Sequence, residues 1–168
     1  IAAGVESMSR VPLGSSAAGA PPAPGLWRRY PEGLVNQGVS AELIAHRWSL
    51  SREDLDDYSA RSHHRAARAH ADGLFDSQLL PVEVAGGDVD RDETVRPSTT
   101  VAGLAGLSPA FRTPEAEGRF PQLSWNVTAG NSSPLTDAAS AVLIMSESRA
   151  VELGLRPRAR FHAFTVVG

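Results

Sequence analysis

The amino-acid sequence predicts an α/β domain built in layers, and three observations support this prediction. The last part of the chain has the pattern of a strand, a helix and a second strand, over 142–145, 146–153 and 158–167. A strongly patterned helix is expected over 51–71. The 168 residues, 42% hydrophobic and 21% charged, suffice for one domain with a buried core.

Composition narrows the possible functions. The net charge of −3 argues against a nucleic-acid-binding protein, which usually carries a basic surplus. The longest mainly apolar stretch, 138–145, is too short to cross a bilayer. Because the sequence contains no cysteine, these residues hold no disulfide, no thiolate zinc site and no cysteine nucleophile.

Both ends of the sequence are apolar, whereas natural termini are usually polar and frayed. The opening Ile-Ala-Ala-Gly resembles the tail of a buried strand, and 164–168 is an apolar run. We therefore expect that both flanks are missing. No export signal, a basic start followed by an apolar stretch, is visible, so we expect a cytoplasmic location.

The first 50 residues predict one surface segment and one helix. Residues 11–33 are rich in proline, glycine and serine and lack periodicity, which is typical of an excursion over the surface. A helix is expected at about 37–48, with Leu43, Ile44 and Trp48 on one face.

The helix expected over 51–71 has signals at both ends. Ser51 can cap its start, and Asp54 stands where a capping box has Glu or Gln. Gly73 suits a left-handed stop. The predicted apolar stripe consists of Leu55, Tyr58, Ser62, Ala66 and Ala69.

The second half of the chain predicts shorter elements. We expect a strand over 81–84 ended by Gly86 and Gly87, a short helix over 99–107 and a loop over 108–124. A buried strand over 142–145, a helix over 146–153 between Ser146 and Gly154, and a core strand over 158–167 complete the series.

No metal site is predicted. His63 and His64 are adjacent and point about 100° apart on a helix, so they do not easily share one ion. His63 and His70 are two turns apart, which is too far without other ligands. The alternating aspartates of 88–92 lack the glycine and the final glutamate of a calcium loop, so an acidic surface turn is expected.

Two segments combine small and hydroxylated residues with a neighbouring strand-like run. They are Gly-Val-Glu-Ser-Met-Ser-Arg at 4–10 and Thr-Ala-Gly-Asn-Ser-Ser at 128–133. Such junctions let the backbone approach a ligand and offer amide and hydroxyl donors. The same composition is typical of ordinary turns, and the residues alone leave both interpretations open.

These two segments resemble the thiolase family. Residues 2–9, Ala-Ala-Gly-Val-Glu-Ser-Met-Ser, match the family's Ala-Gly-Gly-x-Glu-Ser-Met-Ser. Residues 128–133, followed by Asp137 and the run 138–146, match its Thr-Ala-Gly-Asn-x-Ser and the strand after it. Between them the family order recurs at Gly38, Val39, Ser40, Ala41, Glu42, Ser51, Arg52, Glu53, Asp56, Ser62, His63, Gly73, Pro81, Asp92, Glu93, Arg96, Pro109, Ala110 and Phe111.

The resemblance covers essentially the whole chain and implies a thiolase-like layered α/β/α fold, incomplete and with an inserted loop domain. It implies that 1–10 ends a core strand of the N-terminal domain and begins the next loop. Residues 11–124 would form the loop domain that covers coenzyme A, and 125–168 would return to the core as strand, helix and strand.

The resemblance also implies an acyltransferase that acts on acyl-CoA and CoA, without a permanently bound cofactor. The family's nucleophilic cysteine lies upstream of Ile1. Its Gly-His-Pro histidine, its Asn-Glu-x-Phe asparagine and its second cysteine lie downstream of Gly168. We therefore expect no catalytic residue in this chain and no activity of the chain alone. Thiolases are commonly homodimers or homotetramers, which is the association implied here.

Four residues match positions that contact coenzyme A in the family. Arg96 corresponds to an arginine that stacks near the adenine, for which a planar guanidinium is suited. Ser133 corresponds to a serine on the pantetheine arm, and Gly103 and Phe111 fall in the same groove. The residues alone favour an exposed Arg96, a turn-capping Ser133 and a core Phe111.

Departures from the family pattern bear on the substrate. Biosynthetic acetoacetyl-CoA thiolases have His-Met where this chain has Asn36-Gln37. In this motif the chain is more similar to degradative, β-oxidation-type members. Ala138 replaces a common glycine. The alternative function is a non-catalytic coenzyme-A-binding or oligomerisation module, and a ketoacyl synthase is a third, against which the long loop domain argues.

Overall fold

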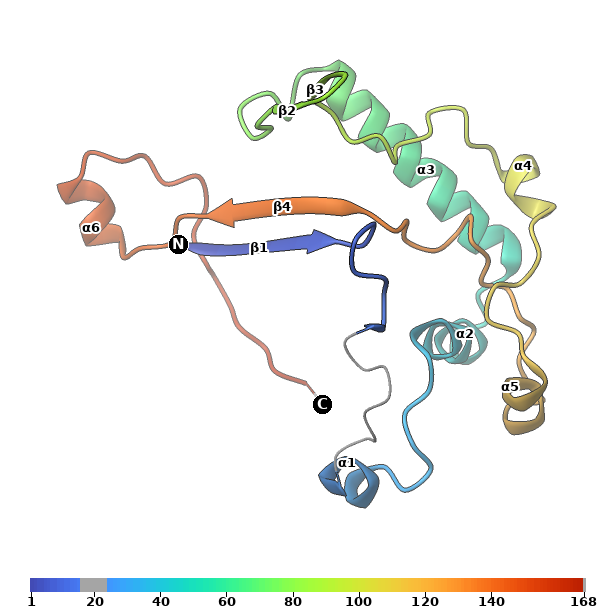
Figure 1. Ribbon diagram of the computed structural model, residues 1–168. Helices are drawn as coiled ribbons and strands as arrows, with labels where there is room; N and C mark the ends of the chain where they lie inside the picture. Colours follow the sequence, from blue (N-terminus) through green and yellow to red (C-terminus); the bar gives the residue numbers. More distant parts are fainter. Residues whose placement is uncertain (16–23, 168) are drawn as a thin grey trace. The chain divides into compact units, whose positions relative to one another are not determined.

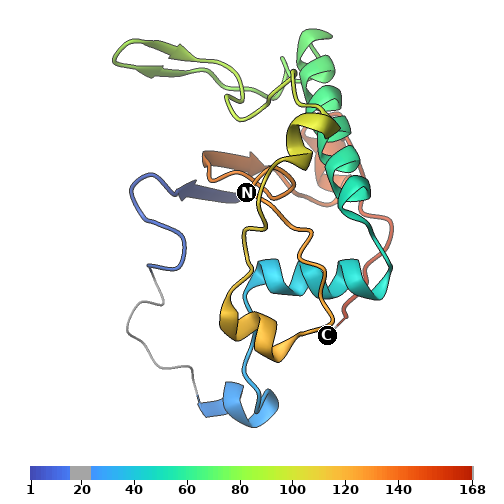
Figure 2. The ribbon, with the colours of Figure 1, turned by 90° about the vertical axis from the view of Figure 1, so that its right-hand side faces the viewer.

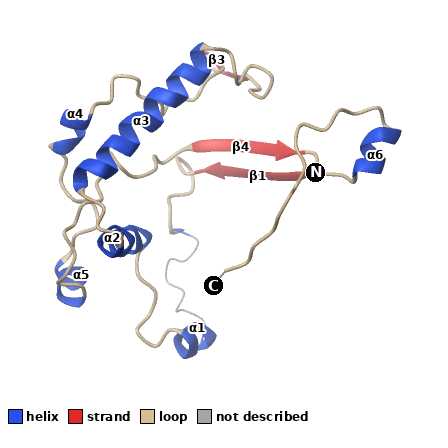
Figure 3. Ribbon diagram, turned by 180° about the vertical axis from the view of Figure 1, so that it is seen from behind, coloured by secondary structure: helices blue, strands red, loops and turns tan. Residues whose placement is uncertain are grey.

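A computed structural model of the protein describes residues 1–15 and 24–167. Within these residues the chain forms two compact units. One unit joins the two ends of the chain, 1–15 and 136–167, and holds β1, β4 and α6. The other, 24–135, holds the remaining helices and a small hairpin (Figures 1 and 3).

The first unit is built on a two-stranded antiparallel sheet. β1 (Ala2–Ser7) pairs with β4 (Asp137–Val142), so that Ala2 lies opposite Val142 and Ser7 opposite Asp137. The strand predicted at the start of the chain is therefore confirmed, but its predicted burial is wrong. Val5 is 75% exposed, because no layer of the described residues covers the faces of this sheet.

The strand predicted over 142–145 is wrong in position. β4 ends at Val142, and Leu143 and Ile144 follow it outside the sheet as exposed residues. The register gives the reason. β1 begins at Ala2, opposite Val142, so residues 143–145 have no ladder partner in β1.

The last part of the chain agrees with one prediction and contradicts another. α6 (Glu147–Glu152) is capped by the Ser146 hydroxyl, and Gly154 follows with a φ of 64°, as predicted. The core strand predicted over 158–167 is wrong, because this segment pairs with no described strand. Its apolar residues remain exposed, Val166 to 98%.

Ser9 and Asp137 join the turn after β1 to the start of β4. The carboxylate of Asp137 accepts hydrogen bonds from the Ser9 hydroxyl and from the Ser9 backbone N–H, the latter at 2.9 Å. These bonds, the hydroxyl's above all, hold the pKa of Asp137 below its ordinary value, since they favour the charged form.

The second unit contains the two longest helices. α2 (Gln37–Arg47) begins where the Asn36 side chain accepts a hydrogen bond from the N–H of Gly38 at 2.8 Å. The predicted helix is confirmed, but its predicted face is wrong for Ile44 and Trp48, which are 53% and 60% exposed. The inner face is formed instead by Gly38, Val39, Glu42 and Ala45.

α3 (Arg52–Ala71) is the longest helix and ends as predicted at both termini. Ser51 and Asp54 form a capping box, and Gly73 adopts a φ of 68°. The predicted apolar stripe is wrong at Tyr58, which is 69% exposed, and at Ser62, whereas Leu55, Ala66 and Ala69 are half-buried. The buried face is centred on Asp56 and Ala60, and the Asp56 carboxylate is hydrogen-bonded there to Arg52 and Asn131.

The shorter elements complete this unit (Figure 2). The predicted strand and the predicted short helix are confirmed as β2 and α4. The strand has a partner across Ala85 and Gly86, and a short helix interrupts the loop predicted over 108–124. Residues 16–23 of the predicted surface excursion lie outside the described residues. The bounds are α1 (Pro24–Arg29), β2 (Val82–Val84), β3 (Gly87–Val89), α4 (Val101–Ala105) and α5 (Pro114–Arg119).

A small apolar core lies between α2, α5 and the segment after α5. Its buried members are Val39, Leu123 and Trp125, and partly buried residues surround them, among them Phe111. The ring of Phe111 lies directly on Gly38. A β-carbon at position 38 would stand 2.1 Å from Cγ of that ring.

Replacing Gly38 with alanine is therefore expected to destabilise the protein. In an ordinary helix this change stabilises by roughly 0.5–1 kcal/mol, but overpacking against a ring costs about 1–3 kcal/mol. Gly118→Ala in α5 is the matched control, because a β-carbon there meets nothing within 4 Å. Urea unfolding should give a lower midpoint for Gly38→Ala and an unchanged or higher one for Gly118→Ala. A higher midpoint for both would contradict the packing described.

The contact between Ser9 and Asp137 predicts a pH dependence. A carboxyl with a lowered pKa contributes stability above its ordinary value of 3.8, and that stability is lost as the pH falls through the lower folded value. Carboxyl-carbon NMR should show Asp137 titrating below 3.8 and shifting upward in Ser9→Ala. Ser148→Ala on α6 should leave the titration unchanged; an unshifted Asp137 in Ser9→Ala would refute the assigned cause.

Candidate functional site

The candidate site is built around an irregular segment, 123–133, that two buried carboxylates hold in place. Glu42 of α2 and Asp56 of α3 are each 1% exposed. Both lie in the unit 24–135, as do all residues described below. Because a buried carboxylate must be hydrogen-bonded or paired, the partners of these two residues define how the segment is fixed.

Glu42 binds the backbone of the segment. Its carboxylate oxygens accept hydrogen bonds from two successive N–H groups, those of Asn126 at 2.9 Å and Val127 at 2.6 Å. These amides follow Trp125, which is buried with a left-handed φ of 56°. Successive amides that point at one anion form a concave binding site, and here an acid of the protein itself fills it.

The turn at 128–133 is bonded to itself. The N–H of fully buried Thr128 donates to Oδ1 of Asn131 at 2.8 Å, and the N–H of Gly130 donates to Oγ1 of Thr128 at 3.2 Å. The hydroxyl of Ser132 donates to the carbonyl of Thr128 at 2.6 Å. These bonds fix the backbone that leads into Ser133.

Asn131 connects this turn to α3. Its Nδ2 donates to Oδ1 of Asp56 at 2.9 Å and to the carbonyl oxygen of Asn126 at 3.0 Å. The other oxygen of Asp56 pairs with Nε of Arg52 at 2.8 Å. Arg52 also donates to the carbonyl oxygens of Leu104 and Leu107, the latter at 3.1 Å. One ion pair on α3 therefore joins the turn to α4.

The four residues predicted to contact coenzyme A lie on separate segments. Arg96, Gly103 and Ser133 are exposed, whereas Phe111 is half-buried against Gly38. The N–H of Arg96 donates to Nδ1 of His63 at 3.1 Å. Gly103 lies in α4, whose N-cap Thr100 accepts its N–H at 3.1 Å.

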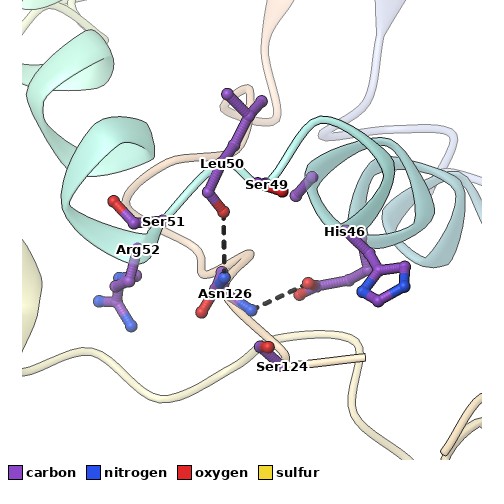
Figure 4. A pocket seen from close by; sticks show the side chains of 9 residues that line it. His46, Ser49, Leu50, Ser51, Arg52, Ser124 and Asn126 are labelled. Atoms are coloured by element: carbon purple, nitrogen blue, oxygen red, sulfur yellow. Dashed lines mark hydrogen bonds between the residues drawn. The ribbon is translucent and has the colours of Figure 1, made fainter. Parts of the chain in front are cut away.

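Open depressions on this unit are lined mostly by residues other than these four. One, of about 460 Å³, has a polar lining that includes His46, Ser49, Ser124 and Asn126 (Figure 4). Nδ2 of Asn126 donates across it to the carbonyl of Leu50 at 3.4 Å. None of the four predicted residues lines it. A second depression, of about 420 Å³, is lined in part by Phe111 and Asn36.

The sequence alone assigns no role to the residues that support this segment. Arg52 and Asp56 are spaced by four, which places both on one face of a helix, and Ala60 continues that face. That spacing was the available signal. The partners on 104–107 and 131 are more than 50 residues away in the sequence, so no local pattern identifies them.

Residues 1–15 and 24–167 lack two features of other classes of protein. They contain no cluster of three or more His, Cys, Asp or Glu side chains that could hold a metal ion. They also contain no helix that is both long and apolar enough to span a bilayer.

The chain matches one known protein family over most of its length. Residues 1–148 match the family model described as the N-terminal domain of thiolase. The chain belongs to the thiolase family. It is 43% identical to a 3-ketoacyl-CoA thiolase of Escherichia coli O1:K1 over 98% of its own length and 41% of that relative's. It is 42% identical to the enzyme of the same description from Salmonella typhimurium, with the same coverage.

Solved thiolase structures confirm the predicted thiolase-like α/β fold. The dimeric peroxisomal thiolase of Saccharomyces cerevisiae matches 92% of this chain and 38% of its own, with a TM-score of 0.72 and 29% identity. The acetyl-CoA acetyltransferase of Bacillus anthracis matches 73% of this chain and 30% of its own, with a TM-score of 0.60 and 38% identity. This thiolase chain thus spans about 41% of the length of its curated relatives.

The role of Glu42 gives a prediction on stability. Glu42→Ala leaves two buried N–H groups without an acceptor, and each is expected to cost about 1–3 kcal/mol of unfolding free energy. Glu32→Ala is the matched control, because Glu32 is exposed and its ion pair with Arg119, at 3.5 Å, is worth at most about 1 kcal/mol. Urea unfolding should show a much larger loss for Glu42→Ala. Equal losses would refute the assigned role of Glu42.

Proposed function

We propose that this chain is part of a thiolase that transfers acyl groups between acyl-CoA and CoA or acetyl-CoA. The reaction would be thiolytic cleavage of a 3-ketoacyl-CoA or the reverse Claisen condensation. The observation that carries the proposal is the 43% identity to a 3-ketoacyl-CoA thiolase across 98% of the chain. Its family-matching turn, 128–133, is also fixed by hydrogen bonds rather than left as a free loop.

The nucleophile of this reaction must lie outside these 168 residues, since they contain no cysteine. In the proposed cleavage, a cysteine thiolate attacks the 3-keto carbon and the bond between carbons 2 and 3 breaks. Acetyl-CoA leaves as its enolate, which takes up a proton, and an acyl-enzyme thioester remains. The thiolate of free CoA then attacks this thioester, which gives acyl-CoA and restores the cysteine.

The contribution of the present residues would be to bind coenzyme A, with 11–124 as the loop domain that covers it. Arg96 would stack near the adenine, for which its exposed guanidinium is available. Ser133 would contact the pantetheine arm from the end of the fixed turn. Gly103 and Phe111 would line the same groove. No catalytic residue, permanent cofactor or metal is proposed within these residues.

The substrate class and the assembly are part of the same proposal. Asn36 and Gln37 replace the His-Met of acetoacetyl-CoA thiolases, which supports a degradative, β-oxidation role with longer acyl chains. In the structure Asn36 caps α2, so the first of these positions has a local role as well. We propose a cytoplasmic homodimer or homotetramer; the dimeric yeast thiolase supports the dimer.

The test uses the protein encoded by the complete gene. With a 3-ketoacyl-CoA and free CoA, it should remove the enolate absorbance faster than a protein-free control, whereas the 168-residue chain alone should not. Arg96→Ala should raise the KM for CoA about tenfold, as expected for about 1.4 kcal/mol of lost binding, with kcat little changed. Arg91→Ala, also exposed, is the matched control. Binding of CoA without turnover would instead favour the non-catalytic module.

A further inference from the structure

Helix α3 presents three polar side chains to three different segments of the unit. Arg52, Asp56 and His63 are separated by four and seven residues, so they lie along one face of the helix. Their face is the inner one, on which Ala60 is buried. Each of the three makes a hydrogen bond to a partner more than 30 residues away in the sequence.

We propose that Arg52, Asp56 and His63 are positioning residues that set the distances between the coenzyme-A-contacting segments. This inference rests on the proposed function, because it takes Arg96, Gly103 and Ser133 as ligand contacts. None of the three positioning residues is proposed to touch the ligand. Each acts by holding the backbone that carries a contact residue.

Arg52 holds α4, which carries Gly103. Its guanidinium donates to the carbonyl oxygens of Leu104 and Leu107, at the end of that helix. Leu104 lies in the last turn of α4 and Leu107 two residues after its end, so the guanidinium binds the chain on both sides of the point where it leaves the helix. A planar group with several donors can bind two carbonyls and a carboxylate at once, and lysine cannot reproduce this arrangement.

Asp56 holds the turn that leads into Ser133. Its carboxylate accepts a hydrogen bond from Nδ2 of Asn131. Oδ1 of Asn131 in turn accepts a hydrogen bond from the N–H of Thr128. The turn is therefore fixed through the Asn131 side chain, because both its nitrogen and its oxygen are hydrogen-bonded. Because Asp56 also pairs with Arg52 at 2.8 Å, the turn and α4 share one anchor on α3.

His63 holds the backbone at Arg96. Its Nδ1 accepts the N–H of Arg96 at 3.1 Å, so the neutral ring carries its proton on Nε2. The Arg96 side chain itself is exposed and unconstrained by this bond. The histidine thus fixes the backbone of Arg96 and leaves its guanidinium free to stack on a ligand.

A purely stabilising role does not account for this choice of side chains. A partly buried ion pair such as Arg52 with Asp56 loses hydration, and apolar residues of similar size often stabilise a fold equally well. The three bonds instead tie chain segments to a rigid helix. From Arg52 to His63 the helix rises by about 16 Å, so the three attachment points are held at fixed distances from one another.

The sharpest test distinguishes the binding of the nucleotide end of CoA from the binding of its pantetheine end. We compare the binding of CoA and of pantetheine to the full-length protein, by calorimetry for CoA and ligand-observed NMR for pantetheine. His63→Ala should weaken CoA binding about fivefold, the effect of roughly 1 kcal/mol, because Arg96 is placed less well for the nucleotide. It should leave pantetheine binding unchanged, since pantetheine lacks the nucleotide.

Two controls accompany His63→Ala. In His63→Asn the side-chain oxygen can stand close to the position of Nδ1, so an acceptor for the Arg96 N–H is kept and CoA binding should stay within about twofold of the wild type. His64→Ala removes the neighbouring histidine, which is exposed on another face of α3, and should change neither ligand. Far-UV circular dichroism and thermal unfolding identify any variant that has lost its fold.

Asp56→Asn tests the other end. It removes the charge that pairs with Arg52 and disturbs the anchor of the turn, so it should weaken pantetheine and CoA by similar factors, of about five to ten. The split between the two ligands is the decisive result. Equal effects of His63→Ala on both ligands, or none on CoA, overturn the inference. A wild-type protein that binds no CoA refutes the proposed function itself, and the inference with it.

Discussion

The segment 123–133 forms no helix or strand beyond an isolated bridge at Thr128, yet it buries Leu123, Trp125, Val127 and Thr128, and the unit 24–135 is organised around this requirement. Buried backbone groups need partners, since each unpaired one costs free energy. Glu42 supplies acceptors for two amides, and Asp56, through Asn131, supports the turn that follows. Among the described residues, every buried side-chain nitrogen and oxygen atom has a hydrogen-bond partner.

In this arrangement, buried side chains support the backbone, and exposed side chains are the ones proposed to bind the ligand. The buried carboxylate of Glu42 accepts backbone N–H groups, and that of Asp56 is bonded to the side chains of Arg52 and Asn131. The groups proposed to meet coenzyme A, such as Arg96 and Ser133, are exposed above them. For the proposed binding of a long, flexible ligand, a backbone whose path is fixed before the ligand arrives lowers the cost of ordering the site.

The sequence predicts local features of this fold better than long-range ones. The caps of α3 and α6 depend on neighbours within a few residues, and Ser51, Asp54 and Gly154 were correctly assigned. The inner face of α3 was not, because the burial of Asp56 depends on Asn131, 75 residues away. The strand expected over 158–167 fails for a similar reason, since a strand requires a partner that composition does not reveal. The proposed coenzyme-A contacts follow from family motifs, whereas the long-range bonds that support them follow only from the fold.

The attachment of three segments to one face of α3 also limits how the gene can change in length. An insertion of one residue between Arg52 and His63 would turn the rest of the helix by about 100° and move His63 off the face that meets Arg96. Past Ala71 the chain leaves the helix and forms the exposed hairpin of β2 and β3. Relatives should therefore differ in length after α3 and in the hairpin, while the interval from Arg52 to His63 stays constant at eleven residues.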